Sequence, residues 1–149
     1  MTTRFAPETL ATPASHLDLL TRPICGVLTT IGGDGQPQSS LVWADIDDDG
    51  RCARVNTTLE RRKGRNLLAN PKVSLLVVDP DNTARFLQVR GDAELGTDGA
   101  LEHLDALTRS YTRHPRYYGY IYPAAQRWRE TRVSCRIHAR RVTLDAIHA

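Results

Sequence analysis

Residues 56–71 read Asn-Thr-Thr-Leu-Glu-Arg-Arg-Lys-Gly-Arg-Asn-Leu-Leu-Ala-Asn-Pro and decide how the middle of the chain folds. Thr57 and Glu60 stand three positions apart, which is the spacing of a capping box at the start of a helix. Pro71 cannot continue a helix, and it disfavours helical geometry at the residue before it. The stretch therefore predicts the end of a strand, followed by a helix from about residue 58 to residue 69.

Three cations, Arg61, Arg62 and Lys63, crowd the first two turns of this predicted helix. The partial positive charge at a helix N-terminus disfavours such neighbours by about 0.3–1 kcal/mol each. A bound anion would reverse that sign, because the free N–H groups and the cations would then converge on it. A solvated basic face is the alternative interpretation. The helical repeat also predicts a buried stripe that consists of Gly64, Leu67 and Leu68.

The composition is that of an ordinary globular protein. The chain has 149 residues, of which 40% are hydrophobic and 25% charged, with a net charge of +3 and a pI near 9.0. This basicity suits an anionic small molecule and is too weak to indicate nucleic acid by itself. The three cysteines lack metal-ligand spacing, and no apolar run is long enough for a membrane span, which together favour a cytoplasmic protein. We expect a flexible N-terminal arm over residues 1–14 and a single domain over residues 15–149.

Six segments have the composition of β-strands. They are residues 24–31, 36–46, 51–57, 73–78, 85–95 and 133–144. Short turns rich in glycine and aspartate join the first three segments, at residues 32–35 and 47–50. A short helix is predicted to open at Ser15, and another to run from Thr97 or Asp98 to near residue 114. This order predicts a mainly β fold, a small six-stranded antiparallel barrel.

Three of the strands carry more detailed signals. Residues 85–95 alternate between apolar and polar side chains, which predicts one buried face. Residues 73–78 are almost continuously apolar, which predicts a strand buried on both faces. In the last strand the apolar phase slips, and a bulge near Arg140 and Arg141 would explain the slip.

Residues 116–129 form an unusual segment that holds four of the five tyrosines together with several arginines. Aromatic and arginine side chains in such a mixture can stack on nucleic-acid bases. The same side chains can pack in a dimer interface or cover a planar cofactor. The modest net charge favours the cofactor over nucleic acid.

Taken together, four segments resemble the pyridoxamine-phosphate-oxidase-like split β-barrel proteins. Residues 24–40 look like the opening hairpin of that family. Residues 61–67 and 70–75 are similar to its R-x-K-x-x-N-L…P-x-V-S/A-L segment, and residues 86–93 to the strand that follows. The resemblance extends over about residues 16–145 and is nearest to the branch that depends on coenzyme F420.

The resemblance implies which residues bind the cofactor. In the family the basic helix segment holds the cofactor phosphate, which corresponds here to Arg61 and Lys63, with Arg65 and Asn66 nearby. Strand residues beside the ring correspond to Thr29, Thr30, Ser39, Ser40 and Trp43. The full set of predicted cofactor-binding residues is Thr29, Ser39, Ser40, Trp43, Thr57, Arg61, Lys63, Arg65 and Asn66.

The resemblance also implies a function. It suggests a homodimeric oxidoreductase that transfers a hydride between the deazaflavin F420 and a conjugated or planar organic substrate, with no nucleic-acid or membrane partner. It assigns no catalytic side chain; a tyrosine among residues 117–122, or a nearby arginine, is the candidate to protonate or hold the acceptor. An FMN-binding flavoprotein and a non-enzymatic carrier of F420 or flavin are the alternatives, because both would use a similar basic segment.

Overall fold

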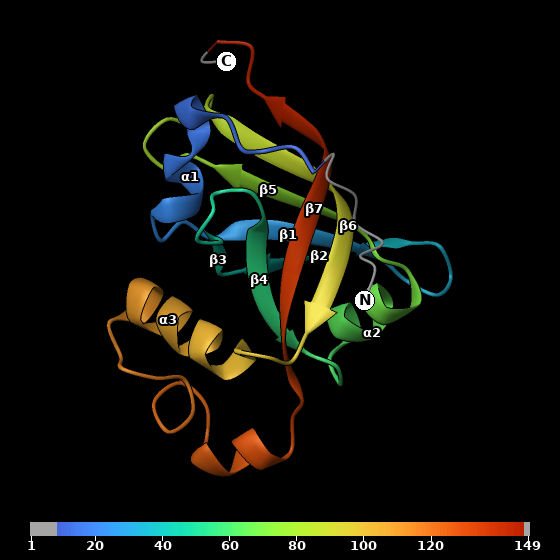
Figure 1. The fold of residues 1–149 in the computed structure, drawn as a ribbon, viewed down its shortest axis with the longest axis vertical. Coiled ribbons are helices and arrows are strands. Elements are labelled where there is room, and N and C mark those ends of the chain that lie inside the picture. Colours follow the sequence, from blue (N-terminus) through green and yellow to red (C-terminus); the bar gives the residue numbers. More distant parts are fainter. Residues whose placement is uncertain (1–8, 148–149) are drawn as a thin grey trace.

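The computed structural model describes residues 9–147, and its main feature is one strongly curved antiparallel sheet (Figure 1). The strands are β1 (Gly26–Ile31), β2 (Pro37–Val42), β3 (Ala44–Ile46), β4 (Ala53–Thr58), β5 (Lys72–Val78), β6 (Phe86–Gly96) and β7 (Arg132–Leu144). The helices are α1 (Asp18–Thr21), α2 (Arg62–Ala69) and α3 (Ala100–Thr112), with 3₁₀ turns at Ala14–His16 and Ala124–Trp128. Figure 1 shows α3 and the segment that follows it below the sheet. The prediction of a mainly β fold is confirmed.

The sheet has seven strands in the order β2-β1-β5-β6-β7-β4-β3, rather than the six predicted. The difference comes from residues 36–46, which form two strands separated by Trp43. The hydroxyl of Tyr111 lies 2.7 Å from the carbonyl oxygen of Ile24 and accepts a 3.0 Å hydrogen bond from the N–H of Ala44, so it occupies the break. Because β2 and β3 are consecutive, the chain joins the two edges of the curved sheet, as in a split barrel.

The inner face of the sheet carries the hydrophobic core. Its fully buried side chains include Leu28, Val55, Leu75, Leu87 and Ile137, one from each of five strands. The predicted alternation along residues 85–95 is confirmed. The prediction that residues 73–78 are buried on both faces is wrong, because Ser74, Leu76 and Val78 on the outer face of β5 are only half-buried.

The bulge predicted in the last strand is confirmed at Arg140. Arg90 pairs with Arg141 while Gly91 pairs with Ala139, so Arg140 is the extra residue of β7. The backbones approach closely at this point. A Cβ atom on Gly91 would lie 2.0 Å from the carbonyl oxygen of His138, which explains the glycine.

Helix α2 begins at Arg62, four residues later than the capping box predicted. β4 continues through Thr58, which pairs with Arg132 of β7. Thr58, the first residue of the predicted helix, is therefore part of the sheet. Thr58 Oγ1 accepts from the N–H of Arg61 at 3.1 Å, and the Glu60 carboxylate accepts from the N–H of Thr131 at 2.8 Å. The predicted capping box of Thr57 and Glu60 is therefore wrong.

The buried stripe of α2 also differs from the prediction. Gly64 and Leu67 are buried as expected, but Leu68 is 62% exposed and Asn66 takes its place against the sheet. The Asn66 amide donates to Thr30 Oγ1 at 3.0 Å and to Gln38 Oε1 at 3.2 Å, which anchors α2 on the β1–β2 hairpin. With these two bonds, α2 faces the sheet with Asn66, whereas the apolar pattern predicted that Leu68 would face it.

The N-terminal arm predicted for residues 1–14 lies partly outside the described residues, which begin at Thr9. From there the chain contacts β7, where the N–H of Leu10 donates to the carbonyl oxygen of Ala139 at 3.0 Å. His16 and Asp145, both buried, approach to 2.8 Å and tie the first helical turn to the end of β7. Across residues 9–147, the helices are all too short or too polar to cross a bilayer.

Candidate functional site

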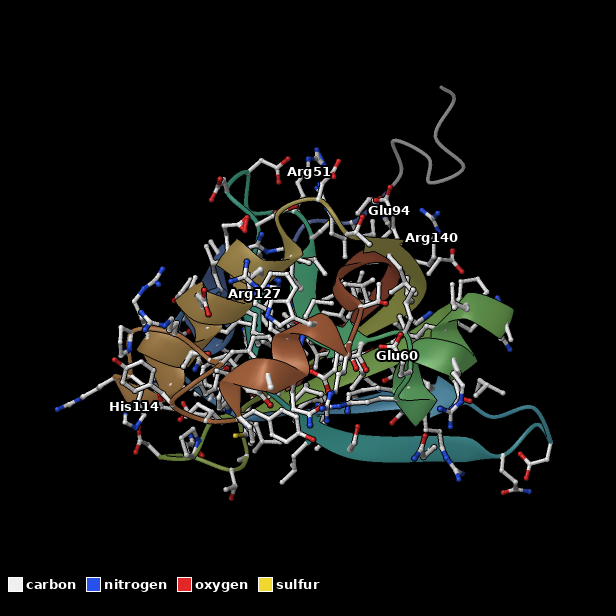
Figure 2. The ribbon with its side chains drawn as sticks, turned by 90° about the horizontal axis from the view of Figure 1, so that it is seen from below. Arg51, Glu60, Glu94, His114, Arg127 and Arg140 are labelled. Atoms are coloured by element: carbon white, nitrogen blue, oxygen red, sulfur yellow. The ribbon has the colours of Figure 1, made fainter. Side chains whose placement is uncertain are left out.

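A cavity of about 220 Å³ lies where α3, the start of α2 and the β2–β3 break converge. The segment between α3 and β7, residues 113–131 and called the α3–β7 segment below, covers part of it. Figure 2 shows this segment in front of the sheet, with Glu60 labelled beside the start of α2. The residues that line the cavity are Cys25, Leu41, Val42, Trp43, Asn56, Arg61, Lys63, Leu104, Leu107, Tyr117, Ile121 and Arg132.

Three cations line this cavity and are incompletely balanced. Glu130 pairs with Arg61 at 3.6 Å and with Arg132 at 3.4 Å, whereas Lys63 has no acidic partner within residues 9–147. Burial lowers the pKa of Lys63, and the neighbouring charges of Arg61 and Arg132 lower it further. A group whose charged form is disfavoured in this way is stabilised by an approaching anion. The cavity is therefore built to attract negative charge.

Arg132 is fixed more firmly than the other two cations, because its side chain is only 8% exposed. Its Nε donates to the hydroxyl of Tyr118 at 2.8 Å, and an Nη donates to Asn56 Oδ1 at 3.3 Å. The guanidinium also lies over the ring of Tyr117, 4.8 Å from its centroid, in cation–π geometry. Arg132 thus presents its charge in one orientation and links the α3–β7 segment to β4.

Aromatic side chains also line the cavity, and one of them, Tyr117, lies against the guanidinium described above. Trp43 stacks on Tyr111, with ring centroids 5.4 Å apart and an interplanar angle of 18°. Tyr117 meets Trp43 edge-on, at 6.3 Å and 80°. Leu104 and Leu107 of α3 complete an apolar surface beside these rings. A planar ligand with an anionic group matches this combination of a flat apolar wall and a basic rim.

The structure brings together only some of the predicted site residues. Trp43, Arg61 and Lys63 all line the cavity, although they come from separate parts of the chain. Arg65 is exposed, and its guanidinium hydrogen-bonds to the carbonyl oxygen of Glu60. Asn66 is buried and bonded to the β1–β2 hairpin, as described above.

The predicted strand residues lie apart from that cavity. Thr29 and Ser39 hydrogen-bond to each other at 2.8 Å on the outer face of β1 and β2. Thr29 lines a second, separate groove on that face. Ser40 is half-buried opposite Leu28. Cofactor contacts at Thr29, Ser39, Ser40, Arg65 and Asn66 stay a prediction.

Sequence reasoning missed Asn56, Arg132, Leu104 and Leu107. Thr57, which it included, is fully buried, and its hydroxyl has no hydrogen-bond partner within the described chain. Arg132 and Asn56 converge only because β4 pairs with β7, and the chain between them is too long for a local pattern to reveal this. The one sequence signal for Arg132 was its position directly after the tyrosine-rich α3–β7 segment.

We expect replacement of Thr57 by valine to raise stability, because the valine methyl replaces a buried hydroxyl that lacks a partner. Removing such an unsatisfied group should increase the free energy of unfolding by about 1 kcal/mol. Urea denaturation of both proteins measures the change. Thr58→Val is the matched control, since it breaks a real hydrogen bond to Arg61 and should lower stability. A less stable Thr57→Val protein would show that this hydroxyl is satisfied in solution.

Comparison with known proteins identifies a family whose match covers all the strands and the residues that line the cavity. Residues 12–144 match the family described as pyridoxamine 5′-phosphate oxidase. A curated pyridoxine/pyridoxamine 5′-phosphate oxidase from Cupriavidus metallidurans is 33% identical over 87 residues, which cover 58% of this chain and 36% of that protein. The chain thus spans little more than a third of the length of this relative.

Two solved structures are similar over most of their length. An F420 reductase superposes with a TM-score of 0.72 and 32% identity, covering 89% of this chain and 98% of that one. A conserved hypothetical protein from Mycobacterium tuberculosis superposes with a TM-score of 0.69 and 27% identity, covering 95% and 89%. With the family match across residues 12–144, these similarities show that the chain belongs to the pyridoxamine 5′-phosphate oxidase family.

Proposed function

We propose that this chain is an F420-dependent oxidoreductase that transfers a hydride between the deazaflavin and a conjugated or planar organic substrate. The observation that carries the proposal is the cavity that Arg61, Lys63 and Arg132 line together with Trp43 and Tyr117. Within residues 9–147, Glu130 is the carboxylate that pairs with two of these cations. The similarity to an F420 reductase across nearly the whole of that protein supports the choice of cofactor.

The residues present fit the anionic part of such a cofactor. Lys63 has no acidic partner among the described residues and a lowered pKa, so a phosphate is the group that it lacks. Arg61 lines the same cavity, where it pairs with Glu130 at 3.6 Å and lies over the ring of Tyr122, 5.9 Å from its centroid. Together Lys63 and Arg61 would hold the phosphate through charge-assisted hydrogen bonds, which are stronger than neutral ones.

The aromatic wall suits the planar part of the cofactor. Trp43, which stacks on Tyr111 and meets Tyr117 edge-on, supplies an aromatic surface that would orient a ring system and keep water from one side of it. A bound deazaflavin supplies the hydride, and the protein supplies binding, orientation and electrostatics. Arg132, fixed by Tyr118 and Asn56, is the residue we assign to hold a negatively charged substrate group.

We further propose that the protein is a homodimer and that a second copy completes the site. The cavity of about 220 Å³ is smaller than the roughly 300–1,000 Å³ of typical ligand sites, so one chain encloses the ligand incompletely. Exposed apolar side chains lie at the cavity or beside it, with Leu41 74% exposed, Ile121 39% and Tyr122 38%. Sedimentation would show twice the mass of the chain. A cytoplasmic location without nucleic-acid or membrane partners goes with this proposal.

FMN is the second candidate cofactor, because the family takes its name from an oxidase and the curated relative is one. Titration of the purified protein with F420 and FMN in parallel separates the two. We expect saturable fluorescence quenching with F420 and binding at least about tenfold weaker with FMN, which corresponds to roughly 1.4 kcal/mol. Tighter binding of FMN would overturn the choice of cofactor.

A turnover assay with reduced F420 and a panel of conjugated acceptors then tests for catalysis. Oxidation of the reduced cofactor that requires both the protein and an acceptor is the expected result. Binding of F420 without turnover of any planar acceptor would instead support a non-enzymatic carrier.

A further inference from the structure

A second groove, of about 370 Å³, lies on the outer face of the sheet, apart from the cavity described above, and Thr29 is its one lining residue that was also predicted from the sequence to contact the cofactor. It crosses β1, β5, β6 and β7, and four cations line it against one carboxylate. The lining residues are Thr29, Ile31, Lys72, Val73, Ser74, Arg90, Gly91, Asp92, Arg140 and Arg141. Its size falls within the range of small-molecule sites, roughly 300–1,000 Å³.

The groove is organised as a straight row of polar side chains across neighbouring strands. Thr29 pairs with Ser74, Ser74 with Arg90, and Arg90 with Arg141. Directly paired residues project to the same face of a sheet, and their chain neighbours Leu28, Leu75 and Val89 point into the core. With strands spaced about 4.8 Å apart, the row is roughly 14 Å long, with hydroxyls at one end and guanidiniums at the other.

The guanidinium end has charge that the described chain does not neutralise. Asp92 is committed to Arg140, whose Nε donates to it at 3.0 Å. The side chains of Arg90 and Arg141 are exposed and have no hydrogen bond or ion pair within residues 9–147. Like charges directly opposite each other in a sheet are destabilising. A dianion placed between the two would convert that repulsion into two charge-assisted contacts.

The hydroxyl end retains hydrogen-bonding capacity. Ser74 Oγ accepts from the amide of Gln88 at 3.1 Å, which leaves its own proton available. Thr29 shares one hydrogen bond with Ser39 and can make another. Two hydroxyls in line with a pair of arginines match a ligand that has its own hydroxyls at one end and its anionic group at the other.

We propose that this groove binds the phosphate ester of a small hydroxylated molecule, with the phosphate between Arg90 and Arg141. The rest of the ligand lies along Ser74 and Thr29. Lys72 adds long-range attraction from the neighbouring row, where it stands opposite Asp92. The site is separate from the cavity that Arg61 and Lys63 line, so it does not depend on the proposed function.

Heteronuclear NMR with ribose 5-phosphate as the probe tests this site, because it locates binding as well as measuring it. We expect saturable shifts of the Ser74 and Gly91 amides in the wild-type protein. The Lys63 and Gly64 amides report separately on the other cavity. Ribose and inorganic phosphate, each carrying half of the recognised chemistry, should bind more weakly at the groove.

The double variant Arg90→Gln/Arg141→Gln should bind ribose 5-phosphate at the groove about tenfold more weakly or worse, since both charge-assisted contacts are lost. Its unfolding temperature should equal or exceed that of the wild type, because the like-charge pair is gone. Arg127→Gln/Arg129→Gln makes the same charge change at exposed positions of the α3–β7 segment and should bind normally. Figure 2 shows Arg127 on that segment and Arg140 elsewhere on the molecule.

Three results would overturn the proposal. The first is a wild-type protein whose Ser74 and Gly91 amides do not respond at millimolar ligand. The second is an equal loss of affinity in the two double variants, which would indicate only general electrostatic attraction. The third is equal affinity for ribose 5-phosphate and inorganic phosphate, which would exclude recognition of the hydroxylated part.

Discussion

Replacing Gly64 with alanine is expected to destabilise the protein more than any other single methyl addition in the central helix. A Cβ atom at this position would lie 1.9 Å from the carbonyl oxygen of Thr58 and 2.9 Å from its carbonyl carbon. Both obstacles belong to the backbone of β4, so no side-chain rotation relieves them. The helix must move away from the strand or the strand must bend.

The size of the effect follows from that geometry. Overpacking of a core usually costs about 1–3 kcal/mol, and a clash with backbone belongs at the upper end, about 3 kcal/mol. For a chain of this length the loss corresponds to a fall in unfolding temperature of roughly 6–12 °C. Thermal unfolding followed by far-ultraviolet circular dichroism measures it.

Gly33→Ala is the matched control, because a Cβ on Gly33 would meet nothing within 4 Å. That substitution should change the free energy of unfolding by less than about 0.5 kcal/mol. If the two variants melted at the same temperature, the close approach of α2 to β4 would be wrong. A folded Gly64→Ala protein should also bind F420 more weakly, since Arg61 and Lys63 flank the displaced turn.

Gly64 also shows what the sequence could reveal and what it could not. A glycine inside a predicted helix costs roughly 1 kcal/mol relative to alanine, so its presence already pointed to a close packing contact. Its contact partner was hidden, because Thr58 was expected to be part of the same helix. The structure places Thr58 in β4, paired with Arg132, and sheet pairing between distant residues overrides a local capping pattern.

Two of the three signals confined to one strand were read correctly. The third, the apolar run of β5, was not, because its outer face is only half-buried. The alternation along β6 and the bulge at Arg140 are local features, and both are confirmed. The break at Trp43 depends on Tyr111, which lies on α3. The sequence around Trp43 alone therefore does not predict the break between β2 and β3.

The candidate site divides in the same way. The resemblance to a family placed Arg61, Lys63 and Trp43 in one site, and the cavity contains all three. Tyr117 belongs to the stretch of residues 117–122 that the sequence already named as candidates, whereas Arg132 became recognisable only from its contacts with Tyr118 and Asn56. Asn66, predicted to lie near the phosphate, also holds α2 on the β1–β2 hairpin, and its contact with a cofactor stays a prediction. The structure thus adds a packing role for Asn66 that the motif alone does not reveal.

The double variant Arg61→Ala/Lys63→Ala is expected to abolish tight cofactor binding while leaving the fold intact. Each lost charge-assisted contact to a phosphate is worth about 1.5–3 kcal/mol, so affinity should fall on the order of 10²–10⁴-fold. Glu130 keeps Arg132 and the Tyr118 hydroxyl as partners when Arg61 is removed, which protects the surrounding structure. Fluorescence titration with F420 measures the loss.

Arg62→Ala/Arg129→Ala removes the same amount of charge at two exposed positions outside the predicted cofactor-binding set and is the matched control. It should retain wild-type affinity within a few-fold. An equal loss in both double variants would mean that the protein attracts the cofactor only through its total charge. Unchanged affinity in Arg61→Ala/Lys63→Ala would remove these residues from the phosphate site.

The pH dependence provides an independent test, because burial and the charges of Arg61 and Arg132 lower the pKa of Lys63 in the free protein. A bound phosphate favours the charged amine and raises that pKa again, so binding takes up a proton between the two values. Affinity for F420 should therefore be highest below the lowered pKa and decline as the pH rises through it. Titrations from about pH 7 to about pH 10 cover the range below the ordinary lysine pKa.

The stability of the ligand-free protein should change with pH in the opposite sense. Between the lowered pKa of folded Lys63 and its ordinary value, the unfolded chain binds more protons than the folded one, so the free energy of unfolding rises with pH. Lys63→Ala removes this contribution and should melt at a temperature no lower than the wild type near neutral pH, while binding F420 poorly. If Lys63 occupies an electrostatically unfavourable position in order to bind the ligand, its replacement should raise stability and lower affinity together. A Lys63→Ala protein that lost stability and kept its affinity would identify the lysine as a structural residue instead.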